Sequence, residues 1–463
     1  MRGAMNIVAP LAAFKAAARS LVAFLMIFCL MVQPTMAQSI LRDAETEALF
    51  DEMSAPLIKA AGLDPRNVKI ALIQDNTINA FVAGGQIVYI HSGLFTAAAN
   101  ANEVQGVIAH ELGHVAGGHV ITTSDGIKTA TKISILSLIL GAAAIAMGAG
   151  DVGAGVLAAG QQAALGKFLA FSRAQESSAD QAGASYLAKS GISGRGSVAF
   201  FKRLQNLEFR YGIPQTDSYE RTHPLSGERI AILQDMYEKD PAWTVPTDPA
   251  IEARFQRVKA KLSGFIDPRR ALIDYPTTNN GIPARYARAY AWHRTAYPDQ
   301  ALAEADTLMR LVPNDPYFLE LKGQILLESG RPQEALPLLR QAVKLTNSQP
   351  LIATTFGHAL IATEDQVNYA EAEKVLKASV NRDNENPFAW YQLGVVYEHS
   401  GDESRAALAA AEGFYLQGRP QLALRSARAA MGGIAKDTPD WIRAQDIALI
   451  SEDLVRNEKR KKR

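Results

Sequence analysis

The sequence predicts a helix-rich α+β domain with a small β-sheet, followed by an all-α repeat domain. Short β-branched runs that alternate in polarity lie within residues 67–95. After about Pro268 such runs vanish, alanine, leucine and aromatic residues become frequent, and a repeat of about 34 residues begins. With 463 residues, the chain is also too long for one ordinary core, which favours two or three domains.

Residues 1–37 are predicted to be a cleaved signal peptide. Lys15 and Arg19 precede the 12-residue apolar run Leu21–Val32, and small residues precede a cut after Ala37. The run is short for a membrane span, which needs about 20 residues. The sole cysteine, Cys29, lies inside it, so the mature chain has no thiol and cannot use a cysteine nucleophile. We therefore expect export to the periplasm.

The charge balance excludes one class of partner. The net charge is +1, with 21% charged and 48% hydrophobic residues, so no nucleic-acid partner is indicated. The final segment, 451–463, ends in "RNEKRKKR". Because like charges repel, we expect a solvated, unfolded basic tail, with a weak anchor to an anionic surface as the alternative.

Residues 38–268 carry the mixed helix and strand signals. A helix is expected from Ser39 to about Ala61, with a kink at Pro56. The runs "KIALIQ" and "QIVYIHS" are expected to be strands, with Gly84 and Gly85 in a turn. Further helices are expected over residues 102–122, 197–209 and 224–237.

An apolar insert, residues 133–166, interrupts this domain. Ile133–Gly150 is 18 residues without charge, and a further 15 uncharged residues follow Asp151. The first run is long enough for a membrane helix, whereas 15 residues give only about 22 Å against a hydrocarbon core of about 30 Å. We therefore expect a helical hairpin packed on the protein or lying against a membrane surface, and a two-span insertion is the alternative.

Residues 269–450 contain the repeat. Gly323, Gly357 and Gly394 each lie seven residues after a proline, at intervals of 34 and 37 residues. This pattern resembles the tetratricopeptide repeat and predicts about four helix pairs from Ala284 to about Ile450. Such pairs stack into a superhelix with a concave groove, whereas an irregular helical bundle is the alternative.

The segment "GVIAHELGHVAGGH", Gly106–His119, predicts a metal site. His110 and His114 are four residues apart and so lie on one face of a helix, which suits two imidazole ligands of one zinc ion. Glu111 lies beside them as the candidate base. Two exposed histidines on an ordinary helix are the alternative, but the apolar, small-residue neighbours favour burial.

A catalytic zinc site needs a third protein ligand. His119 follows His114 by five residues and points elsewhere on a continued helix, so it is expected on the surface or behind the ligands. The better candidate is Glu176, which lies with Asp180 on one face of a second helix. Asp180 could then accept a hydrogen bond from a ligand histidine and orient it. Two solvated acids are the alternative.

Three motifs together carry a family resemblance. "HELGH", then "ESSAD" some 60 residues later, then "THPLSGERI" (Thr222–Ile230) resemble zinc metalloproteases of the CaaX-prenyl-protease and HtpX type. "NAFVAGGQIVYIHSGLF" (Asn79–Phe95) matches the strand segment ahead of their zinc helix. The signal peptide and the repeats make the whole chain similar to periplasmic members with combined protease and chaperone roles. The membrane spans that flank the site in other members are missing, which puts a membrane-embedded substrate chamber in doubt.

The resemblance implies a zincin fold of the gluzincin kind. It implies one Zn²⁺ per chain held by His110, His114 and Glu176, with Glu111 catalytic and Asp180 supporting. The substrate would lie extended along the edge strand near Phe81–Tyr89. His223 could stabilise the oxyanion, occupy the open zinc position, or be a structural loop histidine, and Arg229 could also face the site.

The resulting function hypothesis is an exported zinc metalloendopeptidase that acts on protein substrates. By resemblance, its clients are outer-membrane β-barrel proteins, and the repeats recruit the client or the assembly machinery. A chaperone or scaffold with incidental proteolysis and an integral membrane protease are the alternatives. Residues 133–166 are also a candidate for peripheral contact with a membrane.

Overall fold

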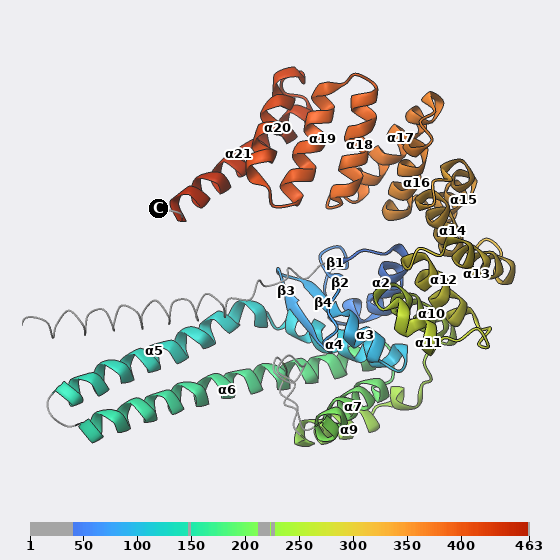
Figure 1. Ribbon diagram of the computed structural model, residues 1–463. Helices are drawn as coiled ribbons and strands as arrows, with labels where there is room; N and C mark the ends of the chain where they lie inside the picture. The colour runs from blue at the N-terminus through green and yellow to red at the C-terminus, as the bar shows by residue number, and fades with distance from the viewer. Residues whose placement is uncertain (1–39, 147–149, 212–222, 224–226, 462–463) are drawn as a thin grey trace, which may run out of the picture. The chain divides into compact units, whose positions relative to one another are not determined.

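The computed structural model describes residues 40–146, 150–211, 223 and 227–461. The predicted signal peptide, residues 1–37, lies outside these residues. Residues 40–463 form one compact unit. The helix-rich architecture, with one small sheet followed by helical repeats, confirms the predicted α+β class (Figure 1).

The sheet has four strands in the order β1-β2-β4-β3. β2 and β4 are parallel, whereas β3 pairs antiparallel with β4 and forms one edge. Gly84 and Gly85 have positive φ and make the tight β3–β4 turn, as expected from the sequence. β1 was not predicted from the sequence, which indicated a helix from Ser39. The helix begins later because Asp43 is its N-cap, so the residues before Asp43 are extended. The strands are β1 (Ile40–Leu41), β2 (Lys69–Ile73), β3 (Ala80–Ala83) and β4 (Ile87–His91).

Helices around the sheet build the core that holds the metal motif. α4 is the central helix, and nearly all of its side chains are buried among those of its neighbours. The prediction that it continues to Thr122 is wrong, because Gly118 takes φ +62° and the helix ends at Ala116. The surrounding helices are α2 (Ala44–Ala60), α3 (Ser92–Ala97), α4 (Ala101–Ala116), α7 (Arg195–Tyr211), α9 (Gly227–Glu238), η1 (Pro241–Thr244), α10 (Pro249–Ile266) and α11 (Pro268–Asp274).

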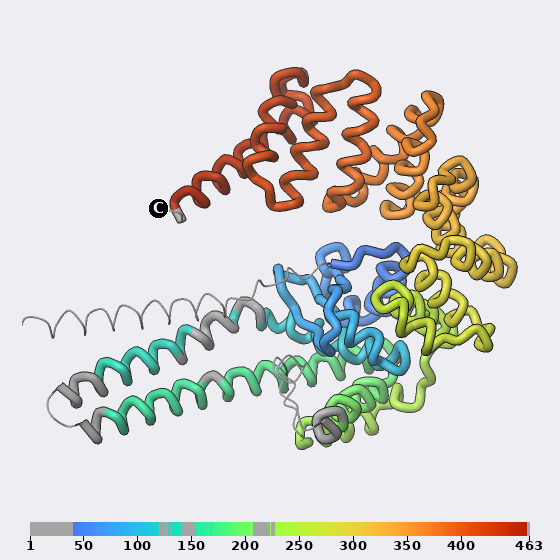
Figure 2. Tube along the Cα trace, viewed as in Figure 1, coloured from blue at the N-terminus to red at the C-terminus, as the bar shows by residue number. Residues whose placement is uncertain are grey.

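Two long helices, α5 (His119–Ala146) and α6 (Gly150–Lys189), lie side by side as a hairpin (Figures 1 and 2). The predicted apolar insert, 133–166, occupies the distal parts of both arms. Among the described residues, no helix has the length and apolarity needed to cross a membrane. α6 continues without a break into the "ESSAD" segment, so one helix carries both the insert and the acidic candidates.

The repeat region, residues 282–461, is fully described and contains ten helices rather than the predicted four pairs. A Cβ on Gly323 or Gly357 would lie 2.6 Å from a leucine of the next helix, which explains the spacing of these glycines. The prediction that the tail is unfolded is wrong, because it is helical to Lys461. Glu452 and Glu458 contact Arg428 and Gln421 of the preceding helix, and Asp453 pairs with Arg456 within the tail. The helices are α12 (Ile282–Arg294), α13 (Pro298–Leu311), α14 (Pro316–Glu328), α15 (Pro332–Leu345), α16 (Pro350–Ala362), α17 (Gln366–Arg382), α18 (Pro387–His399), α19 (Glu403–Leu416), α20 (Pro420–Gly433) and α21 (Pro439–Lys461).

A buried charge cluster joins the first repeat helices to the core. Glu45 of α2 is fully buried and accepts hydrogen bonds from Lys261 Nζ (2.7 Å) and Tyr286 Oη (2.8 Å). Arg257 pairs with Glu45 and, at 2.6 Å, with Asp315 of α14. Burial alone would lower the pKa of Lys261, but the neighbouring carboxylates raise it above its ordinary value. Side chains therefore pack continuously across the predicted domain boundary near residue 268.

Replacing Glu45 by Ala should destabilise the chain strongly. Two buried cations would then share fewer carboxylates, and breaking a buried pair costs about 3 kcal/mol or more. We expect a clear fall in the midpoint of urea unfolding, followed by circular dichroism. Asp235→Ala, which removes an exposed i,i+4 pair with Lys239, is the matched control and should leave the midpoint unchanged. Equal midpoints for the two variants would contradict a structural role for the cluster.

Candidate metal centre

The close crossing of α4 and α6 creates the site. A Cβ on Gly113 of α4 would lie 2.6 Å from the Ala179 carbonyl oxygen of α6, and one on Gly183 of α6 would lie 3.0 Å from that of Ala109. Only glycine permits this backbone approach. The crossing brings the face of α4 that carries His110 and His114 against the face of α6 that carries Glu176.

Four donor atoms converge there. One ligand atom each from His110, His114, Glu176 and His223 lies within 4.8 Å of the others, and all four side chains are buried. The Nε2 atoms of His110 and His114 are 3.1 Å apart, and His223 Nδ1 is 3.2 Å from His110 Nε2. Glu176 oxygens lie 3.3 Å from His114 Nε2 and 3.0 Å from His223 Nδ1.

These separations fit one zinc ion. Tetrahedral bonds of about 2.0–2.1 Å place neighbouring ligand atoms about 3.3 Å apart. Imidazole nitrogens and a carboxylate are also the donor types that zinc accepts. Three imidazoles and a carboxylate buried together at these distances therefore form a set able to hold one metal ion, consistent with Zn²⁺.

Asp180 and Arg229 form the layer behind the donors. Asp180 Oδ1 accepts a hydrogen bond from His110 Nδ1 at 2.9 Å, which leaves Nε2 facing the donor cluster. Arg229 donates to both Asp180 and Glu176, the latter at 2.9 Å. Burial alone would raise the pKa of Asp180, but the Arg229 guanidinium and His110 lower it. Arg229 thus holds two carboxylates rather than opening toward a substrate.

Glu111 has the surroundings of a reactive carboxylate. Its side chain is fully buried, yet neither oxygen has a hydrogen-bond partner among the described residues. The nearest charged-group contact is His223 Nε2, 3.4 Å from Oε1. Burying a carboxylate without hydrogen-bond partners is costly, so Glu111 has unused capacity to accept a hydrogen bond from a polar ligand.

Two further histidines, His119 and His91, are buried in the peptidase region. His119, expected on the surface or behind the ligands, is buried, and its Nδ1 lies 2.9 Å from His114 Nδ1. It reaches this position because the chain turns at Gly117 and Gly118 before α5 begins. His91 is also buried, at the end of β4, with Nδ1 2.8 Å from Thr77 Oγ1.

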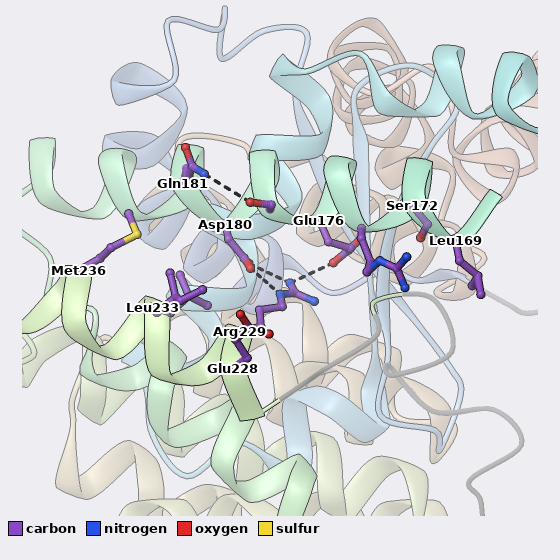
Figure 3. Close-up of a pocket in the computed structure, with 12 residues that line it drawn as sticks. Leu169, Ser172, Glu176, Asp180, Gln181, Glu228, Arg229, Leu233 and Met236 are labelled. Carbon is purple, nitrogen blue, oxygen red and sulfur yellow. Dashed lines mark hydrogen bonds and ion pairs between the residues drawn. The ribbon is translucent and has the colours of Figure 1, made fainter. Parts of the chain in front are cut away.

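A cavity of about 370 Å³ lies beside the centre, between α6 and α9 (Figure 3). Arg229 reaches from α9 toward Asp180 and Glu176 and forms its polar wall. Leu233 and Met236 contribute apolar surface. No periodicity in the sequence indicates this cavity, because it depends on how α9 packs against α6.

Comparison with known proteins identifies the family. The model of peptidase family M48 matches residues 8–237, and a tetratricopeptide repeat model matches residues 294–350. The metalloprotease YcaL of Escherichia coli K12 is 30% identical over 42% of this chain and 72% of its own length. The chain belongs to peptidase family M48. The sequence-based resemblance is confirmed, as is the predicted enzyme class, a zinc metalloendopeptidase. The donor cluster is able to hold one metal ion, consistent with the predicted Zn²⁺.

Two other relatives align with a larger share of this chain. The beta-barrel assembly-enhancing protease of Yersinia pestis is 23% identical over 78% of this chain and 75% of its own length. A putative beta-barrel assembly-enhancing protease of Vibrio cholerae is 25% identical over 61% of this chain. This chain spans 59% of the length of the Vibrio protein.

Replacing Glu176 by Ala should abolish stoichiometric metal binding. The change removes the carboxylate donor and leaves Arg229 with Asp180 as its remaining carboxylate partner. We expect the purified variant to lose its zinc in elemental analysis, whereas Ser177→Ala, an exposed change on the same helix, should retain about one zinc per chain. Full zinc retention by Glu176→Ala would show that another residue is the third ligand, and His119 would be tested next.

Proposed function

We propose that this protein is an exported zinc endopeptidase in which His110, His114 and Glu176 hold the metal and Glu111 is the general base. The observation that carries the proposal is the buried donor cluster with an unpartnered carboxylate beside it. An enzyme of this kind needs a base that is close to the metal but is not a ligand of it. Glu111 meets both conditions.

Each residue has a defined task in peptide hydrolysis. When bound, zinc supplies the Lewis acidity that makes water a nucleophile at neutral pH. Glu111 takes the proton of the attacking water and delivers it to the leaving amine. Asp180 fixes the orientation of His110, and Arg229 keeps Asp180 and Glu176 in place. Burial of these groups excludes bulk water and strengthens their electrostatic interactions.

The edge strand β3 offers a way to align a substrate. It is the outermost strand of the sheet, and among the described residues its other side pairs with no strand. An extended peptide added there would gain backbone hydrogen bonds and pass the donor cluster. β3 lies close to the donor cluster, because the carbonyl oxygen of Ala80 is 3.3 Å from His223 Nε2.

His223 is proposed to hold the centre in a resting form. Its Nδ1 occupies the fourth donor position, and its Nε2 reaches both β3 and Glu111. A substrate carbonyl needs that fourth position, and an extended substrate needs the edge of β3. The contacts therefore favour a gate over the oxyanion role as the resting function of His223.

The physiological setting is also a proposal. The names of the longer relatives suggest that the client is an outer-membrane β-barrel protein in assembly, which would place the enzyme in the periplasm. The repeats would recruit the client or its assembly machinery, because such arrays present extended binding surfaces. A chaperone in which the repeats act and proteolysis is incidental is the second candidate, favoured by the size of the repeat array.

Replacing Glu111 by Gln should retain zinc and lose peptide hydrolysis. The amide preserves the shape but cannot accept the proton, so we expect a fall of about 10²-fold or more in casein cleavage. The same variant in a β-barrel assembly assay separates the two candidates, since a chaperone would keep its assembly function. Near-normal casein turnover would remove Glu111 from the mechanism.

Replacing His223 by Asn should raise basal casein cleavage without lowering zinc content. Asparagine is similar in size but a poor zinc ligand, so the fourth position would open while three donors remain. An oxyanion role predicts the opposite sign, a fall of about 10²–10³-fold. An unchanged rate would leave His223 as a structural loop residue.

A further inference from the structure

The distal part of the α5–α6 hairpin exposes large apolar side chains. Leu138 and Ile139 are 59% and 60% exposed, although both belong to a long stretch without charged residues. Soluble proteins rarely leave such a contiguous apolar patch in water unless a partner covers it. The exposed residues of this part are Ile135, Leu136, Leu138, Ile139, Leu140 and Leu165.

The two arms place small residues between them and large apolar residues outside, which is the reverse of a helix pair in water. The buried contact positions are small: Ser137 is 7% exposed and Ala164 is 5% exposed. The arms approach so closely that a Cβ on Gly160 would lie 1.9 Å from Ser137 Cβ. A water-exposed amphipathic hairpin turns its large apolar side chains inward. Small residues inside and large ones outside are typical of helices that pack in lipid.

The distribution of these side chains identifies the kind of partner. At about 100° per residue, the exposed positions between Ile135 and Leu140 spread over about 200° of the α5 surface, opposite Ser137. A protein groove covers one stripe of a helix, read at intervals of three and four residues. A lipid phase covers every face that the other arm leaves open.

Cationic side chains mark the base of the apolar segment. Lys128 and Lys132 on α5, and Lys167 and Arg173 on α6, are all exposed. Since Ser137 faces Gly160, the two arms place these charges at neighbouring levels of the hairpin. Basic residues at the edge of an apolar segment complement the negative headgroups of a membrane surface.

We propose that the hairpin dips into a bilayer with anionic headgroups, down to the level of Lys132 and Lys167, without crossing it. The uncharged part of α5 beyond Lys132, Ile133–Ala146, is about 21 Å long, against a hydrocarbon core of about 30 Å. Both arms return to the donor cluster, so the cluster stays on the water side. This surface stands independently of the proposed catalytic roles.

An environment-sensitive fluorophore on the hairpin tests the proposal in the full chain. Cys29→Ser removes the sole native cysteine, and Ile139→Cys provides one labelling site. With vesicles of phosphatidylethanolamine and phosphatidylglycerol, we expect a blue shift of the emission and quenching by nitroxide-labelled lipid chains. A label at Val367→Cys, which is 79% exposed in the repeat region, is the control and should report water throughout.

Two sets of changes separate lipid from other occupants. Leu136→Asp with Leu140→Asp should lower vesicle partitioning of the hairpin at least about tenfold per carboxylate, because ionised groups are costly at membrane depth. Lys132→Glu with Lys167→Glu should weaken binding to vesicles that contain phosphatidylglycerol more than binding to phosphatidylcholine vesicles. Zinc content and casein cleavage in solution should be unchanged in both, which shows that the variants are folded.

Three results would overturn the proposal. The label at position 139 could keep a water-like emission while the chain floats with vesicles, which would place the lipid contact elsewhere. A blue shift without lipid that grows with protein concentration would identify a second copy as the occupant. A blue shift only after addition of an unfolded client protein would identify that client instead.

Discussion

The backbone contact between α4 and α6 is the constraint on which the rest of the site depends. At Gly113 the two helices approach more closely than a Cβ atom allows, and at Gly183 a Cβ atom would be in a tight contact of 3.0 Å. Only at that distance can a carboxylate on one helix and two imidazoles on the other share a metal ion. The outer contacts, from Asp180 to His110 and from Arg229 to both acids, fix side chains that the crossing has already brought together. An alanine at either glycine would move the carboxylate donor away from the imidazoles.

The clustering of the candidate ligands and of Asp180 could be predicted in part, because helical spacing places each pair of side chains on one face. His110 and His114, like Glu176 and Asp180, lie four residues apart on one face, so a correct helix assignment suffices. The contact of His223 with Ala80 could not be predicted in this way, since 143 residues separate the two and no periodicity relates them. The break at Gly118 could have been anticipated from the paired glycines, and it explains why His119 lies behind His114 rather than one turn further along a continuous helix.

Composition indicated the change from mixed to all-helical structure, but not how the two regions join. Glu45 and Lys261 are 216 residues apart in sequence, and each looks like a solvated charge on its own helix. Together with Arg257 and Asp315 they form a buried cluster that no local pattern reveals. Such a cluster makes the region around α10, α12 and α14 cooperative, because removal of one charge leaves its partners unpaired. The repeats are therefore bound to the peptidase core by more than a linker.

The continuity of α6 relates the metal centre to the surface proposed to meet lipid. A single helix from Gly150 to Lys189 carries Leu165 and Lys167 at one level and Glu176 at another. The nine residues from Lys167 to Glu176 correspond to about 14 Å, so a headgroup layer at Lys167 would hold the donor cluster close above the membrane. A peptide segment leaving the membrane surface in extended form spans that distance with about four residues. An enzyme held at this height would favour chains that are exposed at a membrane surface over folded proteins in bulk solution, which agrees with the proposed class of client.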